Sequence, residues 1–500
     1  MSHTWQRGAA AQALHLQLAQ RLREQIRLQA MPPGTRLASV RACAREHGVN
    51  PQTVVAAYDL LQAQGLVEAR ARQGFFVRAA PGCATHSGGE AGAARQPGDA
   101  PARRAPPPTR AVALLRAVLA RGDEAAGARA MPGCGSLPAD WLQATPLAQA
   151  LRRLLREDDS VQAFGCTEGD PRLRAQLARL LAEQDVPAAP SHLLLCNGST
   201  QALDLVARSL LRPGDAVMVE RPGPPLAFAQ LARQGLCLLP VPRGPQGPDL
   251  QQVLHWARTR RPRLMLVSTR LHNPTGGDIA TGCAHQLLEL AREHDFLIAE
   301  DDVYAPLCER GPPLLSAMDG LRRTLLLGSL SQLLAPGWRV GFVAAPDFLA
   351  ERLRESKLLA GLASPTLTER ALALLFERGA VPRQAAALRE RLARARRQAV
   401  QAARQHGCRF DFPPRGLFGW VDTGVDTEGL ALCLHDRGYL IAPGRLFDPE
   451  AGPSTRMRLN FAHAQDPAFW REYARALRAC APRPAAQPLR GVNTSELPLA

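Results

Sequence analysis

The sequence contains almost no lysine. Lys357 is the single lysine among 500 residues, whereas arginine occurs 60 times. A lysine amine is the usual group for covalent capture of an aldehyde, so chemistry of that kind has one candidate side chain here. Residues 348–359 are predicted to form a helix in which Lys357 has charged neighbours. We therefore expect Lys357 to lie on a solvated helix face, without a catalytic role.

Long apolar runs and paired cysteines are also absent. No stretch reaches the roughly 18 apolar residues that cross a bilayer, and the first residues lack the apolar core of a signal peptide. The 11 cysteines are scattered, with no CxxC pair and no Cys/His cluster at zinc spacing. We therefore expect no membrane contact, no metal site and a cytoplasmic location.

Positive charge is densest near the N-terminus. The formal net charge is +16 at pH 7, and residues 1–78 carry ten arginines against four acidic residues. Such an excess favours binding to a polyanion. An arginine-rich composition alone also produces a mild excess, so the charge decides nothing without a motif.

Residues 1–78 have the pattern of three helices followed by a hairpin. Apolar residues recur every four positions in residues 11–29, which predicts an amphipathic helix. Residues 39–47 form a second predicted helix, and Asn50 caps a third that runs to residue 65. Residues 66–77 alternate like a β-hairpin. This order of elements predicts a winged helix-turn-helix.

The same region resembles the GntR-type DNA-binding domain, through residues 33–41, 48–54 and 65–67. The resemblance implies that the third helix enters the major groove of double-stranded DNA while arginines contact the backbone. A helical bundle with a solvated arginine face is the alternative. Many family members have an arginine where this chain has Pro51, so one common contact is missing. The implied base-facing residues are Gln52 and Thr53, and the implied backbone and minor-groove contacts are Arg36, Arg41, Arg45, Arg70, Arg72 and Gln73.

Composition divides the rest of the chain into a linker, a large body and a tail. Residues 79–112 are rich in Gly, Ala, Ser and Pro without apolar periodicity, which predicts a flexible linker. Residues 481–500 have the same character and are predicted to be a disordered tail. The body is expected to span residues 113–480, with a large part at about 145–345 and a small part at about 346–480.

The body alternates short apolar runs with helical patterns. Residues 193–195, 216–219, 264–267 and 297–299 are examples of such runs. This alternation predicts a mainly parallel sheet covered by helices. Ligands bind at the carboxyl ends of the strands in such sheets, and most of the polar motifs lie just after one of these runs.

The body resembles class I and II aminotransferases, and the whole chain resembles the MocR subfamily of GntR regulators. The resemblance implies a three-layer fold of the fold-type I pyridoxal-phosphate (PLP) transferases, with a smaller C-terminal α+β part. Residues 328–341 match the loop whose lysine holds the cofactor as a Schiff base, but Gln332 occupies the lysine position. An amide nitrogen cannot form that bond, because its lone pair is delocalised. The resemblance therefore implies PLP as a possible, non-covalent ligand.

Most residues that hold the cofactor in the family have counterparts here. The family's ring-nitrogen aspartate corresponds to Asp301, which lies three residues before Tyr304, and Asn273 corresponds to the donor to the 3-oxygen. Arg458 matches the arginine that grips a substrate carboxylate. Ordinary turn capping and a surface arginine are the alternatives. The implied phosphate contacts are Gly198, Ser199 and Thr200 at a predicted helix N-terminus, with Ser329 and Arg339.

Two positions depart from the enzyme pattern. Pro224 occupies the place of an aromatic residue that lies against the cofactor, and Gln332 removes both the covalent anchor and the base that moves the proton. We therefore predict a DNA-binding transcriptional regulator whose body forms a homodimer and senses a small molecule, which is PLP, a related vitamer or an amino acid. A PLP-dependent aminotransferase with an accessory DNA-binding domain and a body that serves only as a dimerisation scaffold are the alternatives.

Overall fold

The computed structural model describes residues 35–63, 66–70, 74–77, 131–142, 145–157, 163–308, 311–334 and 336–480, together with the single positions 15, 18, 19, 22 and 26. The chain divides into two compact units, Met1–Asp123 and Glu124–Ala500. The predicted linker at 79–112 and the predicted tail at 481–500 lie outside the described residues. None of the described helices is both long enough and apolar enough to cross a membrane.

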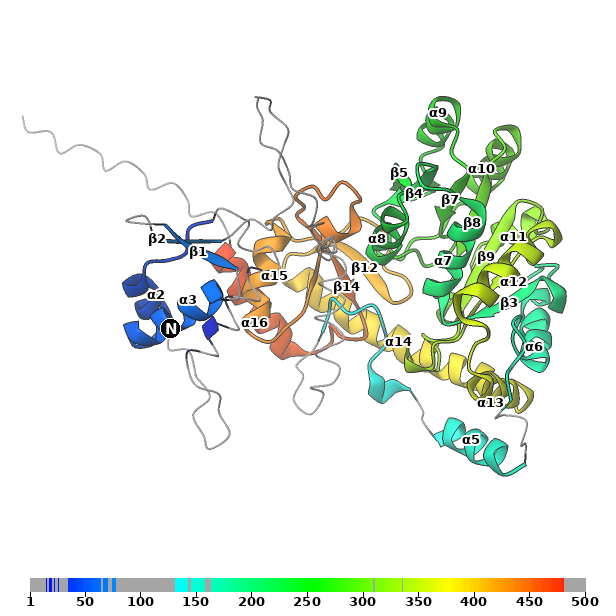
Figure 1. Ribbon diagram of the computed structural model, residues 1–500, viewed down its shortest axis with the longest axis horizontal. Coiled ribbons are helices and arrows are strands. Elements are labelled where there is room, and N and C mark those ends of the chain that lie inside the picture. Colours follow the sequence, from blue (N-terminus) through cyan, green and yellow to red (C-terminus); the bar gives the residue numbers. More distant parts are fainter. Residues whose placement is uncertain are drawn as a thin grey trace, which may run out of the picture. The chain divides into compact units, whose positions relative to one another are not determined.

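The first unit contains two described helices and a two-stranded sheet (Figure 1). Helix α2 (Val40–His47) begins where the Ser39 side chain accepts a hydrogen bond from the Ala42 N–H, and it ends at Gly48 in the left-handed conformation. Helix α3 (Pro51–Ala63) follows Asn50, whose side chain accepts a hydrogen bond from the Gln52 N–H. Strands β1 (Val67–Arg70) and β2 (Gly74–Val77) pair antiparallel. These elements match the predicted second and third helices and the wing.

A small apolar core holds the first unit together. Leu18 and Leu22, two of the five described positions of the predicted first helix, are buried with Val54, Tyr58 and Leu61 of α3. The Tyr58 hydroxyl donates to the Ala38 carbonyl at 2.8 Å, which ties α3 to the segment before α2. The spacing of these apolar residues therefore fixes one buried face on each helix.

The second unit is built on an eight-stranded sheet in the order β3-β10-β9-β8-β7-β4-β5-β6 (Figure 1). Strands β4, β5, β7, β8 and β9 run parallel, and β10 is antiparallel to both of its neighbours. The sheet is thus mainly parallel, as predicted. Its strands are β3 (Leu193–Cys196), β4 (Ala216–Arg221), β5 (Cys237–Gly244), β6 (Gly247–Pro248), β7 (Leu264–Val267), β8 (Leu297–Asp301), β9 (Thr324–Ser329) and β10 (Gly341–Ala344).

Helices cover both faces of this sheet. Val217 and Val219 of β4 belong to one buried cluster, whereas Ala216 and Met218 belong to another on the opposite face. The first face is covered by α7 (Ser199–Leu210), α8 (Pro225–Arg233) and α12 (Asp347–Gly361), and the second by α9 (Leu250–Arg260), α10 (Thr281–Glu293) and α11 (Leu315–Asp319). The predicted three-layer α/β/α architecture is confirmed.

A second, antiparallel sheet has the order β11-β12-β14-β13. The long helix α14, yellow in Figure 1, runs from α13 toward this sheet. The strands are β11 (Arg409–Phe410), β12 (Phe418–Asp422), β13 (Ala442–Pro443) and β14 (Arg456–Asn460). The other described helices are α5 (Thr145–Glu157), α6 (Pro171–Ala182), α13 (Thr366–Glu377), α14 (Ala380–Gln405), α15 (Thr427–His435) and α16 (Pro467–Cys480). Short 3-10 turns lie at Ala139–Trp141, Pro190–His192, Ala305–Leu307, Pro336–Trp338 and Gly444–Phe447.

The expectation that Lys357 lies on a solvated helix face is wrong. This side chain is 1% exposed, and it continues the buried stripe of α12 that contains Leu349 and Leu353. Residues four apart lie on the same helix face, so the spacing places the lysine on the stripe that packs toward the sheet. The charged residues around it in sequence lie on the other faces. Burial lowers the pKa of the Lys357 amine, although nearby Cys196 and Glu369 raise it.

Candidate functional site

The predicted ligand-binding residues gather at the carboxyl ends of the sheet strands. Gly198, Ser199 and Thr200 follow β3, and Asn273 lies in the loop after β7. Asp301 ends β8, Ser329 ends β9 and Gln332 follows it. Arg458 comes from β14 of the second sheet and reaches the same place, because its Nη1 donates to the Asn273 Oδ1 at 2.9 Å. Both parts of the second unit thus contribute to one site.

The N-terminus of α7 and the Arg339 guanidinium together have the features of an anion-binding site, and we call this arrangement the anion cradle. Gly198 caps this helix with a φ of 80°, and the first N–H groups of a helix have no partner inside it. Arg339 extends its guanidinium across the cap, where Nη2 donates to the Asn197 carbonyl at 3.2 Å. The positive φ at residue 198 favours glycine, and a side chain there would also displace that guanidinium. Free N–H groups, a helix dipole and a guanidinium suit a phosphate.

Ser329 lies beside this cradle across one strand. Gly341 of β10 pairs with Ser329 on one side and with Cys196 on the other, and Cys196 precedes the α7 cap by two residues. A Cβ atom at residue 341 would approach both the Gly328 carbonyl oxygen and the Ser199 nitrogen within 2.8 Å. The glycine therefore permits β9 and the α7 cap to approach each other closely. The Ser329 Oγ accepts a hydrogen bond from the Ser331 N–H at 3.2 Å.

The two neighbouring carboxylates at the end of β8 have different environments. Asp302 is held by Arg270, whose Nε and Nη2 donate to its two oxygens at 3.0 and 2.6 Å. Asp301 accepts a hydrogen bond from the Val303 N–H, and no described cation pairs with it. Burial raises the pKa of Asp301 to about 7. Asp301 therefore remains available to a cationic ring nitrogen, whereas Asp302 is already paired.

Gln332 is tied to a segment that the sequence analysis did not single out. Its Nε2 donates to the Gly135 carbonyl at 3.3 Å, and the Tyr304 hydroxyl donates to the same oxygen at 3.2 Å. The Gln332 Oε1 is buried and has no hydrogen-bond partner among the described residues. Asn460 reinforces the segment, because its Nδ2 donates to the carbonyls of Cys134 and Ser136 at 2.9 and 2.8 Å.

Arg458 is buried rather than exposed, so the alternative of a surface arginine is wrong. It is 8% exposed, and its Nη2 donates to the Gly133 carbonyl at 2.7 Å. The guanidinium carbon lies 4.6 Å from the Phe418 ring centre and 5.0 Å from that of Phe447. Its Nε has no partner among the described residues. Burial lowers the pKa of Arg458, and a buried cation of this kind gains from an anionic ligand.

Cys134 is a second residue that sequence reasoning missed. Its Sγ lies 3.1 Å from the Ser136 Oγ. Burial raises the pKa of the thiol, but hydrogen bonds with His463 and Ser136 outweigh burial and lower the pKa to about 7. The flanking Gly133 was the available signal in the sequence, because a Cβ atom there would lie within 2.7 Å of the backbone of Ile441 and Ala442.

This arrangement fits PLP at the phosphate and the ring nitrogen but not at the aldehyde. The anion cradle matches a phosphate, and the unpaired Asp301 carboxylate matches a protonated pyridine nitrogen. Gln332 offers an amide where an amine would be needed, and Pro224 precedes α8 where the family places an aromatic ring. The residues present therefore fit a phosphate and a ring nitrogen, and Gln332 supplies no amine at its position.

The predicted DNA-binding residues lie at the surface of the first unit. Arg36, Arg41, Arg45 and Gln52 are exposed, and Thr53 is half-buried at the start of α3. Arg36 also forms a backbone bridge with Phe76 of β2, which places it at the wing. Arg72 and Gln73 lie outside the described residues, as does the side chain of Arg70.

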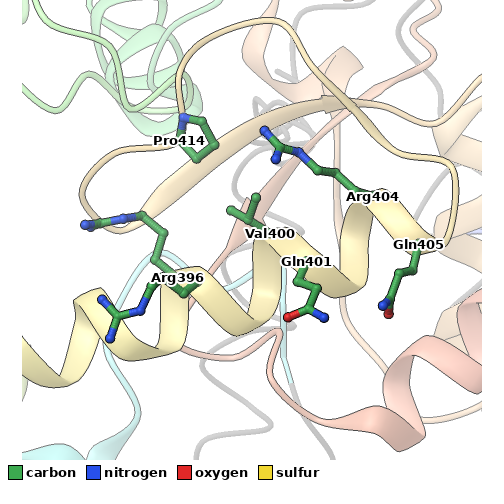
Figure 2. Close-up of a pocket in the computed structure, with 7 residues that line it drawn as sticks. Arg396, Val400, Gln401, Arg404, Gln405 and Pro414 are labelled. Atoms are coloured by element: carbon green, nitrogen blue, oxygen red, sulfur yellow. The ribbon is translucent and has the colours of Figure 1, made fainter.

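A surface groove along α14 contains none of the predicted ligand residues. Val400 and Arg404 extend from the helix toward the loop of Pro414 (Figure 2). The groove is basic and lies apart from the strand ends, so it is a separate surface. Its lining residues are Arg396, Arg397, Val400, Gln401, Arg404, Gln405 and Pro414.

Two families match the chain. Residues 133–471 match "Aminotransferase class I and II", and residues 14–77 match "Bacterial regulatory proteins, gntR family". The chain belongs to the class I and II aminotransferase family and carries a gntR-type helix-turn-helix domain. Its body is similar to the solved structure of LysN, the α-aminoadipate aminotransferase of Thermus thermophilus, in complex with N-(5′-phosphopyridoxyl)-L-leucine. The TM-score is 0.66 and the identity 27%, over 72% of this chain and 94% of LysN.

Relatives that match more than four fifths of this chain include transcriptional regulators. HTH-type transcriptional regulator TauR of Rhodobacter capsulatus is 31% identical over 89% of this chain and 92% of TauR. The probable rhizopine catabolism regulatory protein MocR of Rhizobium meliloti is 29% identical over 84% of this chain and 81% of MocR. The chain thus has MocR- and TauR-type regulator homologues.

Proposed function

We propose that this family member is a DNA-binding transcriptional regulator whose body binds a small molecule of the PLP class without transaminase chemistry. The observation that carries the proposal is that Gln332 lies among retained counterparts of the residues that hold the phosphate, the 3-oxygen and the ring nitrogen. PLP in aminotransferases accepts the electrons of a bond broken at the amino-acid Cα. A neutral amide neither anchors an aldehyde nor takes up the proton released at that carbon, so recognition is separated from reaction.

Each retained residue has a binding role in this proposal. The α7 cap, Ser329 and Arg339 hold the phosphate, and Asn273 donates to the 3-oxygen. Asp301 holds the ring nitrogen in its protonated form, and the partly buried Tyr304 lines the site beside Gln332. Arg458 holds a carboxylate when the ligand contains an amino acid.

The first unit supplies DNA recognition in this proposal. The N-terminus of α3, with Gln52 and Thr53, faces base edges in the major groove of an operator. Arg36, Arg41 and Arg45 contact phosphates, and their exposure leaves them available for that contact. A DNA-binding regulator of this type acts in the cytoplasm, which is the location we propose.

We propose that the body forms a homodimer through an apolar patch at the end of α12. Leu358, Leu359 and Leu362 are 46%, 80% and 55% exposed, and Phe164 is 92% exposed. A Cβ atom at residue 165 would lie 3.9 Å from the Ala363 Cβ, so Phe164 and the end of α12 belong to one surface. Contiguous exposed apolar side chains mark an interaction surface, and a second copy of the chain is the occupant we propose.

Regulation then requires a ligand that prefers one arrangement of the two DNA-binding domains, because a ligand with equal affinity for both arrangements shifts nothing. The test measures binding of the full-length protein to fluorescent fragments of its own upstream DNA, with and without PLP, pyridoxamine phosphate and amino acids. We expect sequence-specific binding that a ligand changes, and no amino transfer to 2-oxoglutarate. Absence of specific DNA binding would contradict the proposal.

An aminotransferase with an accessory DNA-binding domain is the second candidate, and the retained Asp301 and Arg458 favour it. It requires an amino-acid-dependent change in the absorption of the bound cofactor, which the missing amine is expected to prevent. If calorimetry detects no binding of PLP, pyridoxine or any amino acid, the body is a scaffold for dimerisation.

A further inference from the structure

Resting on the proposed function, we propose that Gln332 selects ligands that carry an N–H donor at the 4′ position of the pyridoxyl ring. Pyridoxamine phosphate and N-phosphopyridoxyl amino acids belong to this class, whereas PLP, with an aldehyde oxygen at that position, does not. The site of a former covalent anchor thus becomes a hydrogen-bond acceptor that distinguishes amine from aldehyde.

The orientation of the Gln332 amide follows from its neighbour. The Gly135 carbonyl oxygen can only accept hydrogen bonds, so the amide atom that faces it at 3.3 Å must be the nitrogen. The Tyr304 hydroxyl donates to the same oxygen, so the Gly135 carbonyl accepts two hydrogen bonds. The Gln332 Oε1 consequently points away from Gly135 as a buried acceptor that no described residue satisfies.

An unsatisfied buried acceptor favours a ligand that donates to it. An amine at the 4′ position supplies such a donor, and a protonated amine supplies a charged one, whose hydrogen bonds are stronger than neutral ones. An aldehyde oxygen at the same place is also an acceptor. No hydrogen bond could then form between it and the Gln332 Oε1. A lysine at residue 332 would reverse this preference, because its amine would capture the aldehyde covalently.

The neighbouring carboxylates are already assigned. Asp301 holds the ring nitrogen in the proposed function and Asp302 is occupied by Arg270, so the Gln332 Oε1 is the acceptor that remains for the amine among these described residues. The only lysine, Lys357, is buried in α12, with Cys196 and Glu369 near its amine. For an N-phosphopyridoxyl amino acid, the carboxylate has a partner in Arg458, whose Nε is unsatisfied among the described residues.

The test compares dissociation constants for three phosphates that differ at the 4′ group. Pyridoxamine phosphate carries an amine, PLP an aldehyde and 4-deoxypyridoxine phosphate a methyl group. Isothermal calorimetry on the full-length protein in an amine-free buffer gives the constants without any turnover. We expect pyridoxamine phosphate to bind about 10- to 100-fold more tightly than the methyl compound, as a charged hydrogen bond in a buried site provides, and PLP to bind no better than the methyl compound. Equal or tighter binding of PLP than of pyridoxamine phosphate overturns the proposal.

Variants at residue 332 attribute the preference to the amide oxygen. Gln332→Leu removes the acceptor and is expected to bring pyridoxamine phosphate to the affinity of the methyl compound, whereas Gln332→Glu keeps an acceptor and is expected to retain the preference. A preference that persists in Gln332→Leu overturns the role of Gln332. If that variant fails to fold, loss of the preference in Gln332→Glu overturns it equally. The affinity of N-phosphopyridoxyl-L-leucine is measured for the wild type and for Arg458→Gln. Comparison of its wild-type affinity with that of pyridoxamine phosphate shows which member of the class binds more tightly.

These outcomes are distinguishable from failure of the regulatory function. Loss of specific DNA binding would contradict the regulator and leave the ligand preference measurable. A preference for the aldehyde would contradict the present proposal and leave DNA binding intact.

Discussion

In the proposed function, residue 332 is the position at which recognition is separated from catalysis. The amide of Gln332 lies between the end of β9 and the Gly135 carbonyl, where it keeps contact with the binding site. A glutamine at residue 332 is similar in length to the family's lysine. It therefore changes the chemistry available at this position more than the shape of the side chain. The consequences of this one position can therefore be tested by restoring the amine.

The variant Gln332→Lys is expected to capture PLP covalently. The phosphate cradle and Asp301 hold the ring, and the new amine meets the aldehyde in the manner of the family's lysine. Absorption spectra should turn yellow on addition of PLP, and borohydride reduction followed by peptide mapping should place the adduct at residue 332.

A matched control carries the new lysine at an exposed position away from the site. Gln401→Lys on α14 supplies such an amine. Labelling of Gln332→Lys no greater than that of Gln401→Lys would contradict a retained cofactor cradle.

Lys357 is the second informative residue, because burial lowers its pKa. The unfolded chain holds the proton up to the ordinary lysine value of about 10.4, whereas the folded chain releases it at lower pH. Between these two values the unfolded state binds more protons, so the free energy of unfolding rises with pH. Below the lowered value both states are protonated, and the cost of burying the charge is fully present. The groups that contribute charge around the amine are Cys196, Glu369, Glu168 and Arg174.

We expect Lys357→Met to remove that rise and to increase stability near neutral pH. Each unit by which the pKa is lowered corresponds to about 1.4 kcal/mol of destabilisation of the charged form. Urea unfolding of wild type and variant at about pH 7 and about pH 10 measures both effects. Parallel pH dependence in the two proteins would show that the amine is not buried in solution.

At the scale of elements, the sequence predicts those features that local chemistry determines. Ser39 and Gly48 bound α2, and Asn50 caps α3, since capping depends on residues close in sequence. The alternating runs identified the parallel strands for the same reason. The motifs after these strands are predicted to lie close together, because the carboxyl ends of parallel strands share one edge of a sheet.

Contacts between distant segments could not be predicted in the same way. The burial of Lys357 depends on how α12 packs against the sheet, and its charged neighbours concealed the apolar stripe. The role of residues 133–135 depends on hydrogen bonds to Gln332 and Arg458, which lie about 200 and 325 positions away. No local pattern encodes such contacts.

The elements of the first unit make a separate prediction about DNA. Arg41→Ala is expected to weaken operator binding nearly uniformly across sequences and to reduce the salt slope by about 1 for each phosphate contact removed. Gln52→Ala is expected to relax preference at one base pair by about 1 to 3 kcal/mol. Fluorescence anisotropy over a salt series with operator variants measures both. If neither substitution changes binding, α3 is not the recognition helix.

At the scale of the whole molecule, the apolar patch of Phe164, Leu358, Leu359 and Leu362 is expected to hold the dimer. A carboxylate in a dry interface carries a large desolvation cost, so Leu359→Asp should shift the mass in light scattering from dimer toward monomer. Phe348→Asp serves as the control, because Phe348 is 64% exposed at the opposite end of the same helix. A dimer that survives Leu359→Asp but dissociates with Phe348→Asp would place the interface elsewhere.

The central claim is that the wild-type site recognises a vitamin B6 phosphate without reacting with it. The most direct measurement incubates the full-length protein with PLP, reduces it with borohydride, and maps the modified peptides before assaying amino transfer. The account predicts no phosphopyridoxyl group within residues 124–480, at Lys357 or elsewhere, and no amino transfer. A trapped adduct on Lys357 accompanied by turnover of an amino donor would contradict it.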